Sequence, residues 1–244
     1  LIAQELTYYG LDIYKKRELP KLLHALADVK GLEWIRLHYA YPSKFPLEII
    51  DAIKERSNIC NYLDMPLQHS SDNMLKAMRR QITKAEMNDL IAEIRHRIPG
   101  ICLRTTLIAG FPGETEEDVE DMKDFLQQHR FDRVGIFTYS HEEGTSAHVL
   151  EDDIPHEEKE RRAQEVMEVQ QEISYEKNQE KVNKIFKVPV DKKEAGRYLG
   201  RTELDPVQQD KEVMIASDKK LAIGEFVNVK ITKAYDYDLE GIVV

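Results

Sequence analysis

The sequence predicts an α/β fold, an incomplete barrel or an open α/β sheet, followed by a small antiparallel β-barrel. Three observations predict it. Apolar runs of strand length alternate with helical apolar stripes over about the first 140 residues, a highly charged segment follows, and short strand-like runs separated by glycines come last. Strands that alternate with helices indicate βα units and a parallel sheet. Closely spaced short strands with turn residues between them are typical of a small barrel.

Four runs of β-branched and aromatic residues have the length of strands and are bounded by Gly, Pro or Asp. They are residues 32–40, 63–67, 101–109 and 133–139, and residues 1–4 are interpreted as the end of an earlier strand. Four visible units and one strand end predict an incomplete barrel or an open α/β sheet.

Helical periodicity lies between these runs. The apolar stripes are residues 22–29, 49–53, 87–98 and 119–126. The first follows Pro20, a residue suited to a first helical turn. Thr83 and Glu86 form a capping box before the third stripe, and Thr115 with Asp118 resembles a weaker one before the fourth.

The charged segment from Pro155 to about Lys181 predicts one long, mostly exposed helix with Val166, Val169 and Ile173 on one face. The strand-like runs that predict the small barrel are residues 186–190, 198–199, 213–215, 226–231 and 242–244. We place the domain boundary near residue 182. Residues 1–182 then form the partial barrel with its terminal long helix, and residues 183–244 form the small β-barrel.

Composition limits the class of protein. The chain has 45 acidic and 35 basic residues and a formal net charge of −10, which argues against coating nucleic acid by bulk attraction. The mean hydropathy is −0.54 and no apolar run approaches the length of a membrane span, so we expect no membrane partner. Cys60 and Cys102 lie far apart in the sequence, which favours a cytoplasmic protein with free thiols over a disulfide framework.

Candidate site residues follow the predicted strands, because the working residues of α/β barrels lie at the carboxyl ends of strands. Residues 110–115 (GFPGET) follow the third run and open a helix. Glycines there let a ligand approach the backbone, and the helix N-terminus offers free N–H groups. The alternative is a tight turn with a cap, which spacing alone favours.

Residues 66–72 (PLQHSSD) follow the second run and place Gln68 and Ser70 at the sheet rim. Ser71 or Asp72 is expected to cap the next helix. No second His or Cys stands at ligand spacing from His69, so a metal site is not expected.

Two further positions are candidates. Gln4 is, by itself, an ordinary polar loop residue. Phe137 and Tyr139 end the fourth run, where an aromatic ring either stacks on a purine or packs in the core. Spacing predicts no catalytic triad and no carboxylate pair. From Asn183 to Val244 the basic and acidic residues balance, so strong RNA binding by the terminal barrel is not expected.

Taken together, these segments resemble the radical-SAM methylthiotransferases over nearly the whole chain and in the family's order. The matching stretches are residues 3–10 (AQELTYYG), 62–71 (YLDMPLQHSS), 75–80 (LKAMRR), 104–115 (RTTLIAGFPGET), 131–140 (FDRVGIFTYS), 142–145 (EEGT) and 170–174 (QQEIS). The resemblance implies a partial (truncated) radical-SAM TIM-like barrel followed by a small antiparallel β-barrel, the TRAM barrel, with a further domain ahead of both in the family.

The family's chemistry depends on cysteines. A triplet on the first barrel strand holds a 4Fe-4S cluster that cleaves S-adenosylmethionine to a 5′-deoxyadenosyl radical, and a second cluster in the N-terminal domain supplies sulfur. This sequence has no Cys-x-x-x-Cys-x-x-Cys, and neither Cys60 nor Cys102 replaces it. We therefore expect a C-terminal fragment of a full-length parent with two clusters. The fragment itself is expected to begin inside the second barrel strand, bind no cluster and be inactive.

The resemblance also assigns the S-adenosylmethionine pocket and narrows the substrate. By family position, the pocket is lined by Gln4, Gln68, Ser70, Arg104, Thr106, Gly110, Phe137 and Tyr139. Residues 3–9, 200–206 and 234–241 look like the RimO-like subgroup, which modifies an aspartate side chain of a small-subunit ribosomal protein. An acidic face would steer such a basic partner, and a weak RNA contact is left open. The alternatives are the subgroup that modifies a tRNA adenosine, and a non-catalytic ribosome- or RNA-binding module.

Overall fold

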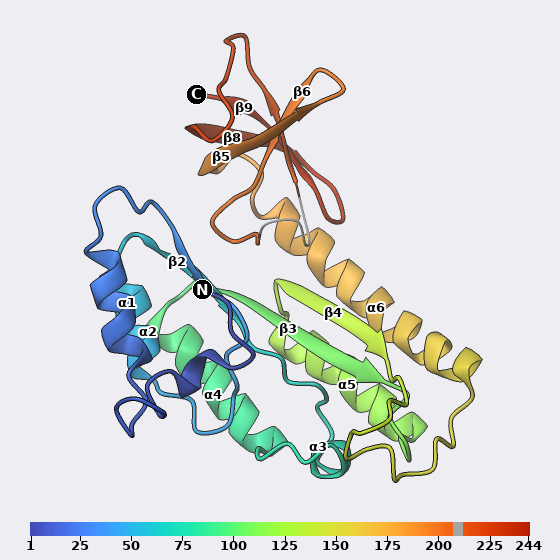
Figure 1. Cartoon of the computed structure of the whole chain (residues 1–244). Helices are drawn as coiled ribbons and strands as arrows, with labels where there is room; N and C mark the ends of the chain where they lie inside the picture. The colour runs from blue at the N-terminus through green and yellow to red at the C-terminus, as the bar shows by residue number, and fades with distance from the viewer. Residues whose placement is uncertain (207–211) are drawn as a thin grey trace. The chain divides into compact units, whose positions relative to one another are not determined.

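A computed structural model describes residues 1–206 and 212–244 of the chain (Figure 1). They form two compact units, Leu1–Gln170 and Gln171–Val244. The division falls inside the last helix, α6 (His156–Gln179). The domain boundary placed near residue 182 stays a prediction.

Four parallel strands form the sheet of the first unit, in the order β1-β2-β3-β4. The strands are β1 (Ile35–Leu37), β2 (Ile59–Asp64), β3 (Cys102–Ala109) and β4 (Arg133–Thr138). Helices connect successive strands, as parallel pairing requires. The predicted α/β class with a parallel sheet is confirmed.

Helices α4 and α5 lie behind strands β3 and β4 in Figure 1, on one face of the sheet. The helices of this unit are η1 (Leu6–Tyr8), α1 (Leu19–Ala27), α2 (Glu48–Glu55), α3 (Asp72–Ala77), α4 (Lys84–Arg97) and α5 (Glu116–His129). Both predicted capping boxes are present, Thr83 with Glu86 on α4 and Thr115 with Asp118 on α5. Each satisfies two backbone N–H groups at the helix start.

The structure differs from the expected elements at three places. Residues 1–4 form no strand, although Leu1 N donates to Arg36 O at 2.7 Å and His38 N to Leu1 O at 3.3 Å, beside β1. The first run shortens to β1 because Tyr39 has a left-handed φ of +59°. The second run is shifted: β2 ends at Asp64, and the apolar residues after it are buried in a connection rather than in a strand.

The second unit holds a closed five-stranded barrel, in the order β5-β6-β7-β9-β8. Its strands are β5 (Ile185–Glu194), β6 (Arg197–Gly200), β7 (Val213–Ala216), β8 (Phe226–Ala234) and β9 (Leu239–Val243). The predicted antiparallel barrel is confirmed, and the structure adds one parallel pair, between β7 and β9. The long helix α6 is also confirmed, with Val166 and Ile173 buried on it.

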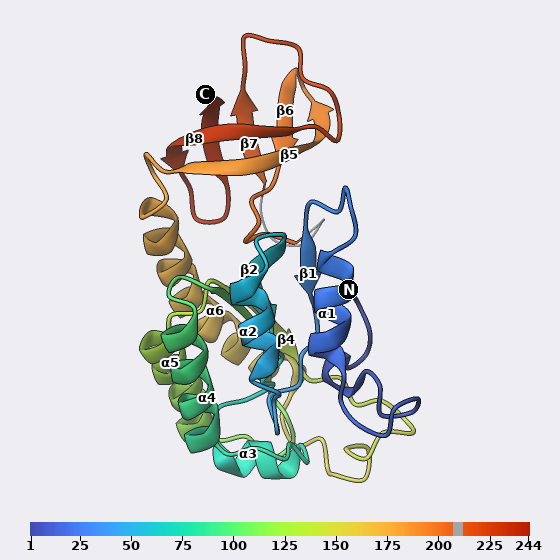
Figure 2. The ribbon, with the colours of Figure 1, turned by 90° about the vertical axis from the view of Figure 1, so that its left-hand side faces the viewer.

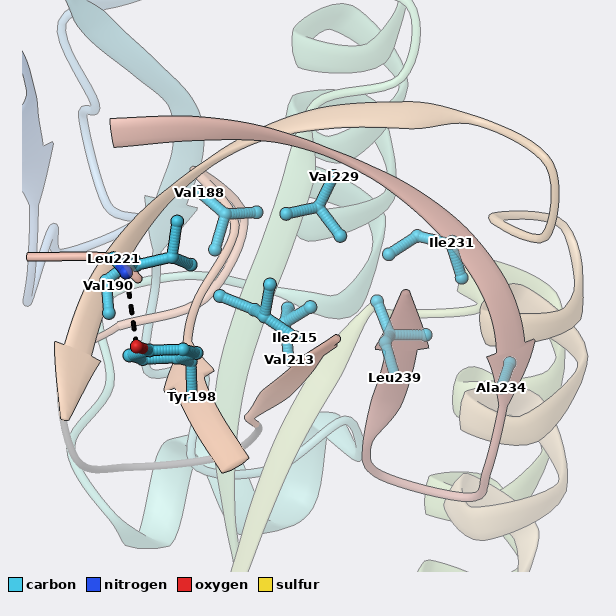
Figure 3. Packing of buried hydrophobic residues seen from close by; sticks show 10 residues of the cluster. All are labelled: Val188, Val190, Tyr198, Val213, Ile215, Leu221, Val229, Ile231, Ala234 and Leu239. Carbon is cyan, nitrogen blue, oxygen red and sulfur yellow. Dashed lines mark hydrogen bonds between the residues drawn. The ribbon is translucent and has the colours of Figure 1, made fainter. Parts of the chain in front are cut away.

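The barrel has an apolar core of its own (Figure 3). The core consists of Val188, Val190, Tyr198, Val213, Ile215, Leu221, Val229, Ile231, Ala234 and Leu239. The polar end of Tyr198 is satisfied, because Leu221 N donates to its hydroxyl at 3.1 Å. Gly200 allows two strands to approach closely: a Cβ there would lie 2.2 Å from Pro189 O.

Candidate functional site

One face of the four-stranded sheet carries polar side chains. Strand β3 alternates, so the fully buried Thr105, Leu107 and Ala109 point to one face and Arg104 and Thr106 to the other. A parallel sheet covered on both faces would be apolar on both. We call the polar face the inner face. By strand register and contacts it comprises His38, Tyr62, Asp64, Arg104, Thr106, Gly135 and Phe137.

A buried charge network lies at the centre of the inner face. Arg104 Nη1 donates to Asp64 Oδ1 at 3.2 Å and to Thr106 Oγ1 at 3.5 Å. His38 Nδ1 lies 3.5 Å from Asp64 Oδ2. The Asp64 and Arg104 side chains are 1% and 11% exposed, so both charges are held largely out of water. Removing either charge would therefore disturb a buried pair.

Aromatic rings flank this network on both sides. The Tyr62 ring lies 5.6 Å from the His38 ring, and the Arg36 guanidinium lies 5.2 Å from the Tyr62 centroid, within cation–π range. Phe137 on β4 is 58% exposed. A Cβ at Gly135 would lie 3.2 Å from the Phe137 ring and 3.6 Å from Arg104 Nη2, so glycine leaves the space between these two side chains open.

The turn of residues 110–115 is built around a buried carboxylate. Glu114 accepts from Gly110 N at 2.9 Å and from Arg162 Nη1 at 3.1 Å, and it lies 3.3 Å from His69 Nε2. Gly110 has a φ of +76°, and a Cβ there would lie 2.2 Å from Lys159 Cγ on α6. Packing against a helix therefore explains this glycine, which favours the reading of a tight turn with a cap.

The connection after β2 faces helix α5. His69 Nδ1 accepts from Ser70 N at 2.9 Å and from Ser71 N at 3.0 Å, and Ser70 Oγ donates to Asp121 Oδ2 at 2.6 Å. Ser71 precedes α3 as expected, but its hydroxyl donates to Asp118 on α5 and makes no cap bond. Burial raises the pKa of Asp118, and hydrogen bonds from Ser71 and Thr115 outweigh it and leave that pKa below its usual value.

Two of the predicted residues sit where the strands end. Gln68 has a φ of +76°, and its backbone pairs with β3 through Gln68 N to Thr106 O and Ile108 N to Gln68 O, both 2.8 Å. The Tyr139 ring packs edge-on against Phe111 at 5.0 Å, and its hydroxyl lies 3.2 Å from His141 Nδ1. Burial is the main cause that raises the pKa of Tyr139.

The structure brings only part of the predicted set together. Arg104, Thr106 and Phe137 share the inner face, and Gln68 is bonded to Thr106 through its backbone. The Ser70 hydroxyl is turned to α5, the Gly110 N–H is bonded to Glu114, and Gln4 is exposed ahead of η1.

Sequence reasoning missed Asp64 and His38, because it searched beyond the strand ends. The sequence signal for this face is a pair of polar residues at positions i and i+2 within an apolar run. Arg36 with His38 and Arg104 with Thr106 are such pairs.

The side chains present fit some cofactors and not others. Cys60 and Cys102 are both buried and form no disulfide, and two thiols cannot supply the ligands of an iron–sulfur cluster. Among residues 1–206 and 212–244, no group of three or more His, Cys, Asp or Glu could hold a metal ion. On the inner face, the Arg104 guanidinium and the exposed Phe137 ring both border the space left open at Gly135.

Comparison with known proteins identifies both parts of the chain. The model of the radical SAM superfamily matches residues 3–126, and the TRAM domain model matches residues 182–244. The chain is 54% identical, over 99% of its length, to the ribosomal protein uS12 methylthiotransferase RimO of Flavobacterium johnsoniae. It is 55% identical over its full length to the protein of that name from Cytophaga hutchinsonii. It spans 55% and 56% of the lengths of these two relatives.

A solved structure shares the fold. Coproporphyrinogen III oxidase from Escherichia coli, a radical SAM enzyme, superposes with a TM-score of 0.52 at 22% identity, covering 65% of this chain and 36% of that one. No helix in the described part of the chain has the length and apolar character that crossing a membrane would need.

Proposed function

Because the chain belongs to the radical SAM superfamily, we propose that it is part of a methylthiotransferase that modifies ribosomal protein uS12. The observation that carries this proposal is identity of 54–55% over nearly the whole chain with relatives that bear that name. The match runs through the TRAM domain as well as the sheet. The proposed target atom lies on an aspartate side chain of uS12, the proposed partner is the small ribosomal subunit, and the proposed compartment is the cytoplasm.

The proposed cofactors of the whole protein are S-adenosylmethionine and two 4Fe-4S clusters, which supply radical chemistry at an unactivated carbon and the sulfur that is transferred. Cys60 and Cys102 do not form a cluster site, so no step is assigned to a cluster in these residues. The part assigned to this chain is to bind and orient the nucleoside.

The proposed S-adenosylmethionine pocket lies at the inner face and the adjoining strand ends. Arg104 would hold the ligand carboxylate, because its planar guanidinium matches a carboxylate in geometry and charge and lies on the inner face, where it also contacts Asp64 and Thr106. Phe137 would stack on the adenine ring. The proposed pocket residues are Gln4, Gln68, Ser70, Arg104, Thr106, Gly110, Phe137 and Tyr139.

The assignment of Arg104 is tested by ligand binding. We expect Arg104→Lys in the full-length protein to weaken S-adenosylmethionine binding about tenfold or more, because lysine cannot reproduce a forked contact with a carboxylate. Isothermal titration against S-adenosylmethionine and against decarboxylated S-adenosylmethionine measures the effect. The two ligands should bind the variant equally, and retained discrimination would refute the role of Arg104.

The substrate is tested with the full-length protein, reconstituted anaerobically. Small ribosomal subunits and tRNA are offered side by side, and mass spectrometry locates any methylthio group. We expect modification of an aspartate of uS12 and none of tRNA. Modified adenosine would support the tRNA subgroup instead, and no product on either would favour a non-catalytic binding module. The 244-residue chain alone should show no cluster absorbance after the same reconstitution.

A further inference from the structure

Two basic grooves lie at the carboxyl end of the sheet and are not used by the proposed function. The first, of about 600 Å³, is lined by Asp72, Lys76, Arg79, Arg80, Gln81, Ile82, Thr83 and Glu86. The second, of about 640 Å³, is lined by Arg17, Glu18, Pro20, Lys21, His24, Lys44, Pro46 and Glu48. The first groove lies where α4 begins, and the second lies where α1 and α2 begin. In Figure 2, β1 points toward the end of the sheet that carries α3 and the N-terminal loop.

Each groove contains one fixed arginine. Arg80 Nη2 donates to Pro66 O at 2.6 Å, and its guanidinium lies 4.4 Å from the Tyr41 centroid. Arg17 Nη1 donates to Lys44 O at 2.5 Å. Residues 41–46 therefore connect the two grooves: Tyr41 packs on the arginine of the first, and Lys44 lines the second.

The remaining cations of the grooves are available. Within the described part of the chain, the charged side-chain groups of Lys76, Arg79, Lys21 and Lys44 make no hydrogen bond or ion pair. Each groove is lined by three cations and two carboxylates, so it keeps a positive excess. Asp72 accepts from Lys84 N at 2.7 Å, Glu86 accepts from Thr83 N at 2.8 Å, and Glu18 is paired with Lys16. Four free positive charges thus face solvent at one end of a protein with a formal net charge of −10.

Exposed tyrosines lie at the same end of the sheet, and the Arg17 guanidinium of the second groove lies 5.0 Å from the Tyr8 ring centroid. Tyr8, Tyr14 and Tyr39 are 48%, 51% and 36% exposed, on the loops that precede α1 and follow β1. Cations interleaved with exposed aromatic rings are the arrangement that binds single-stranded nucleic acid, in which the cations contact phosphates and the rings stack on bases. An acidic peptide would use the cations and leave the rings without a role.

We propose that this rim binds single-stranded RNA through both grooves. The choice of RNA rests on the proposed function, because an enzyme that acts on a ribosomal protein works beside RNA. The inference therefore deepens that function. The phosphates are held by Lys76 and Arg79 in one groove and by Lys21 and Lys44 in the other. The bases contact the exposed tyrosine rings.

The test measures RNA affinity and its salt dependence. A fluorescein-labelled single-stranded RNA is titrated with the full chain between about 50 and 200 mM salt, and anisotropy gives the dissociation constant. Each double variant, Lys76→Gln with Arg79→Gln or Lys21→Gln with Lys44→Gln, should bind about tenfold more weakly at low salt. Its slope of log affinity against log salt should be shallower by about 1.4, for two lost phosphate contacts. Tyr14→Leu should weaken binding without changing the slope.

A matched control removes the same charge from the opposite end of the sheet. Lys30 and Lys54 are exposed and precede β1 and β2, so Lys30→Gln with Lys54→Gln should leave the affinity unchanged. The proposal is overturned if this control weakens binding equally, if polyglutamate displaces the RNA as effectively as unlabelled RNA does, or if duplex RNA binds as tightly as the single strand. Failure here leaves the uS12 modification assay unaffected, so the two hypotheses fail separately.

Discussion

Asp64 is the most enclosed charge of the inner face, held between Arg104 at 3.2 Å and His38 at 3.5 Å. Asp64→Asn should lower the free energy of unfolding by about 3 kcal/mol, because it removes the buried negative charge that Arg104 and His38 both approach. Urea unfolding measures this. Asp51→Asn is the control: its partner Arg97 is equally close at 3.0 Å, but the two side chains are 48% and 29% exposed, so the cost should stay below about 1 kcal/mol. Equal costs would show that Asp64 is not electrostatically buried.

His129 makes stability depend on pH. Burial, followed by Arg95 and Lys84, lowers its pKa from 6.5 to about 4. Between these values the unfolded chain binds a proton that the folded chain does not. This stability contribution is therefore complete above about pH 6.5 and is lost as the pH falls toward 4. Between pH 7.5 and 5 the loss should be about 2 kcal/mol.

The measurement compares urea unfolding at pH 7.5 and 5 for the native chain and for His129→Gln, which cannot take up a proton. The variant should lose about 2 kcal/mol less over this interval. His96→Gln, at an exposed position on α4, should behave like the native chain. If His129→Gln retains the full pH dependence, the lowered pKa is wrong.

Within the candidate site, only the residues that lie on a clearly identified strand could be placed from the sequence. Arg104 and Thr106 lie on a strand identified from its apolar run, and the resemblance supplied them. Asp64 was missed because it ends β2, whose position was predicted several residues too late. The partners of Ser70 and Gly110 lie 51 and 49 residues further along the chain, on α5 and α6, and no local pattern encodes such contacts.

At the scale of elements, the turn between β3 and α5 depends on the packing of α6. Gly110→Ala should destabilise the first unit by more than about 2 kcal/mol, because the new Cβ would meet Lys159 Cγ at 2.2 Å and φ is +76°. Gly113→Ala is the control: φ is +80°, but no atom lies within 4 Å of the new Cβ. Its cost should be the backbone term alone, about 1 kcal/mol. Thermal unfolding of both variants separates the steric clash from the backbone strain. Equal decreases in melting temperature would contradict the predicted clash at Gly110.

Elements with a strong local signal were predictable, and those set by tertiary contacts were not. The capping boxes of α4 and α5 fix the helix starts by themselves, so Thr83 and Thr115 could be assigned from the sequence. The apolar run at residues 63–67 was ambiguous, because buried connections and strands have the same composition. Pro66 has no N–H for strand pairing, and β2 ends before it. The short α3 has too few residues to show a helical period.

At the scale of the whole molecule, two separate cores predict two separate unfolding transitions. Trp34 is the single tryptophan and lies in the first unit, so its fluorescence reports that unit alone. Val229→Ala removes two methyl groups from the barrel core and should destabilise the barrel by about 2 kcal/mol without shifting the fluorescence transition. Circular dichroism detects the barrel transition.

The reciprocal variant is Leu107→Ala, at a fully buried position on β3. It should move the Trp34 transition to lower urea concentration, with a cost of about 3 kcal/mol, and leave the barrel transition in place. If either variant shifts both transitions together, the two units unfold as one cooperative body.

The alternation along β3 restricts how the length of this strand can vary. Because neighbouring residues face opposite sides, inserting one residue ahead of Arg104 would exchange the two faces from there on, placing Leu107 on the inner face and the Arg104 guanidinium among the helices. An insertion of two residues would restore the order. Strand β3 should therefore tolerate an insertion of two residues better than an insertion of one. The surface loops between elements should accept one or two residues equally.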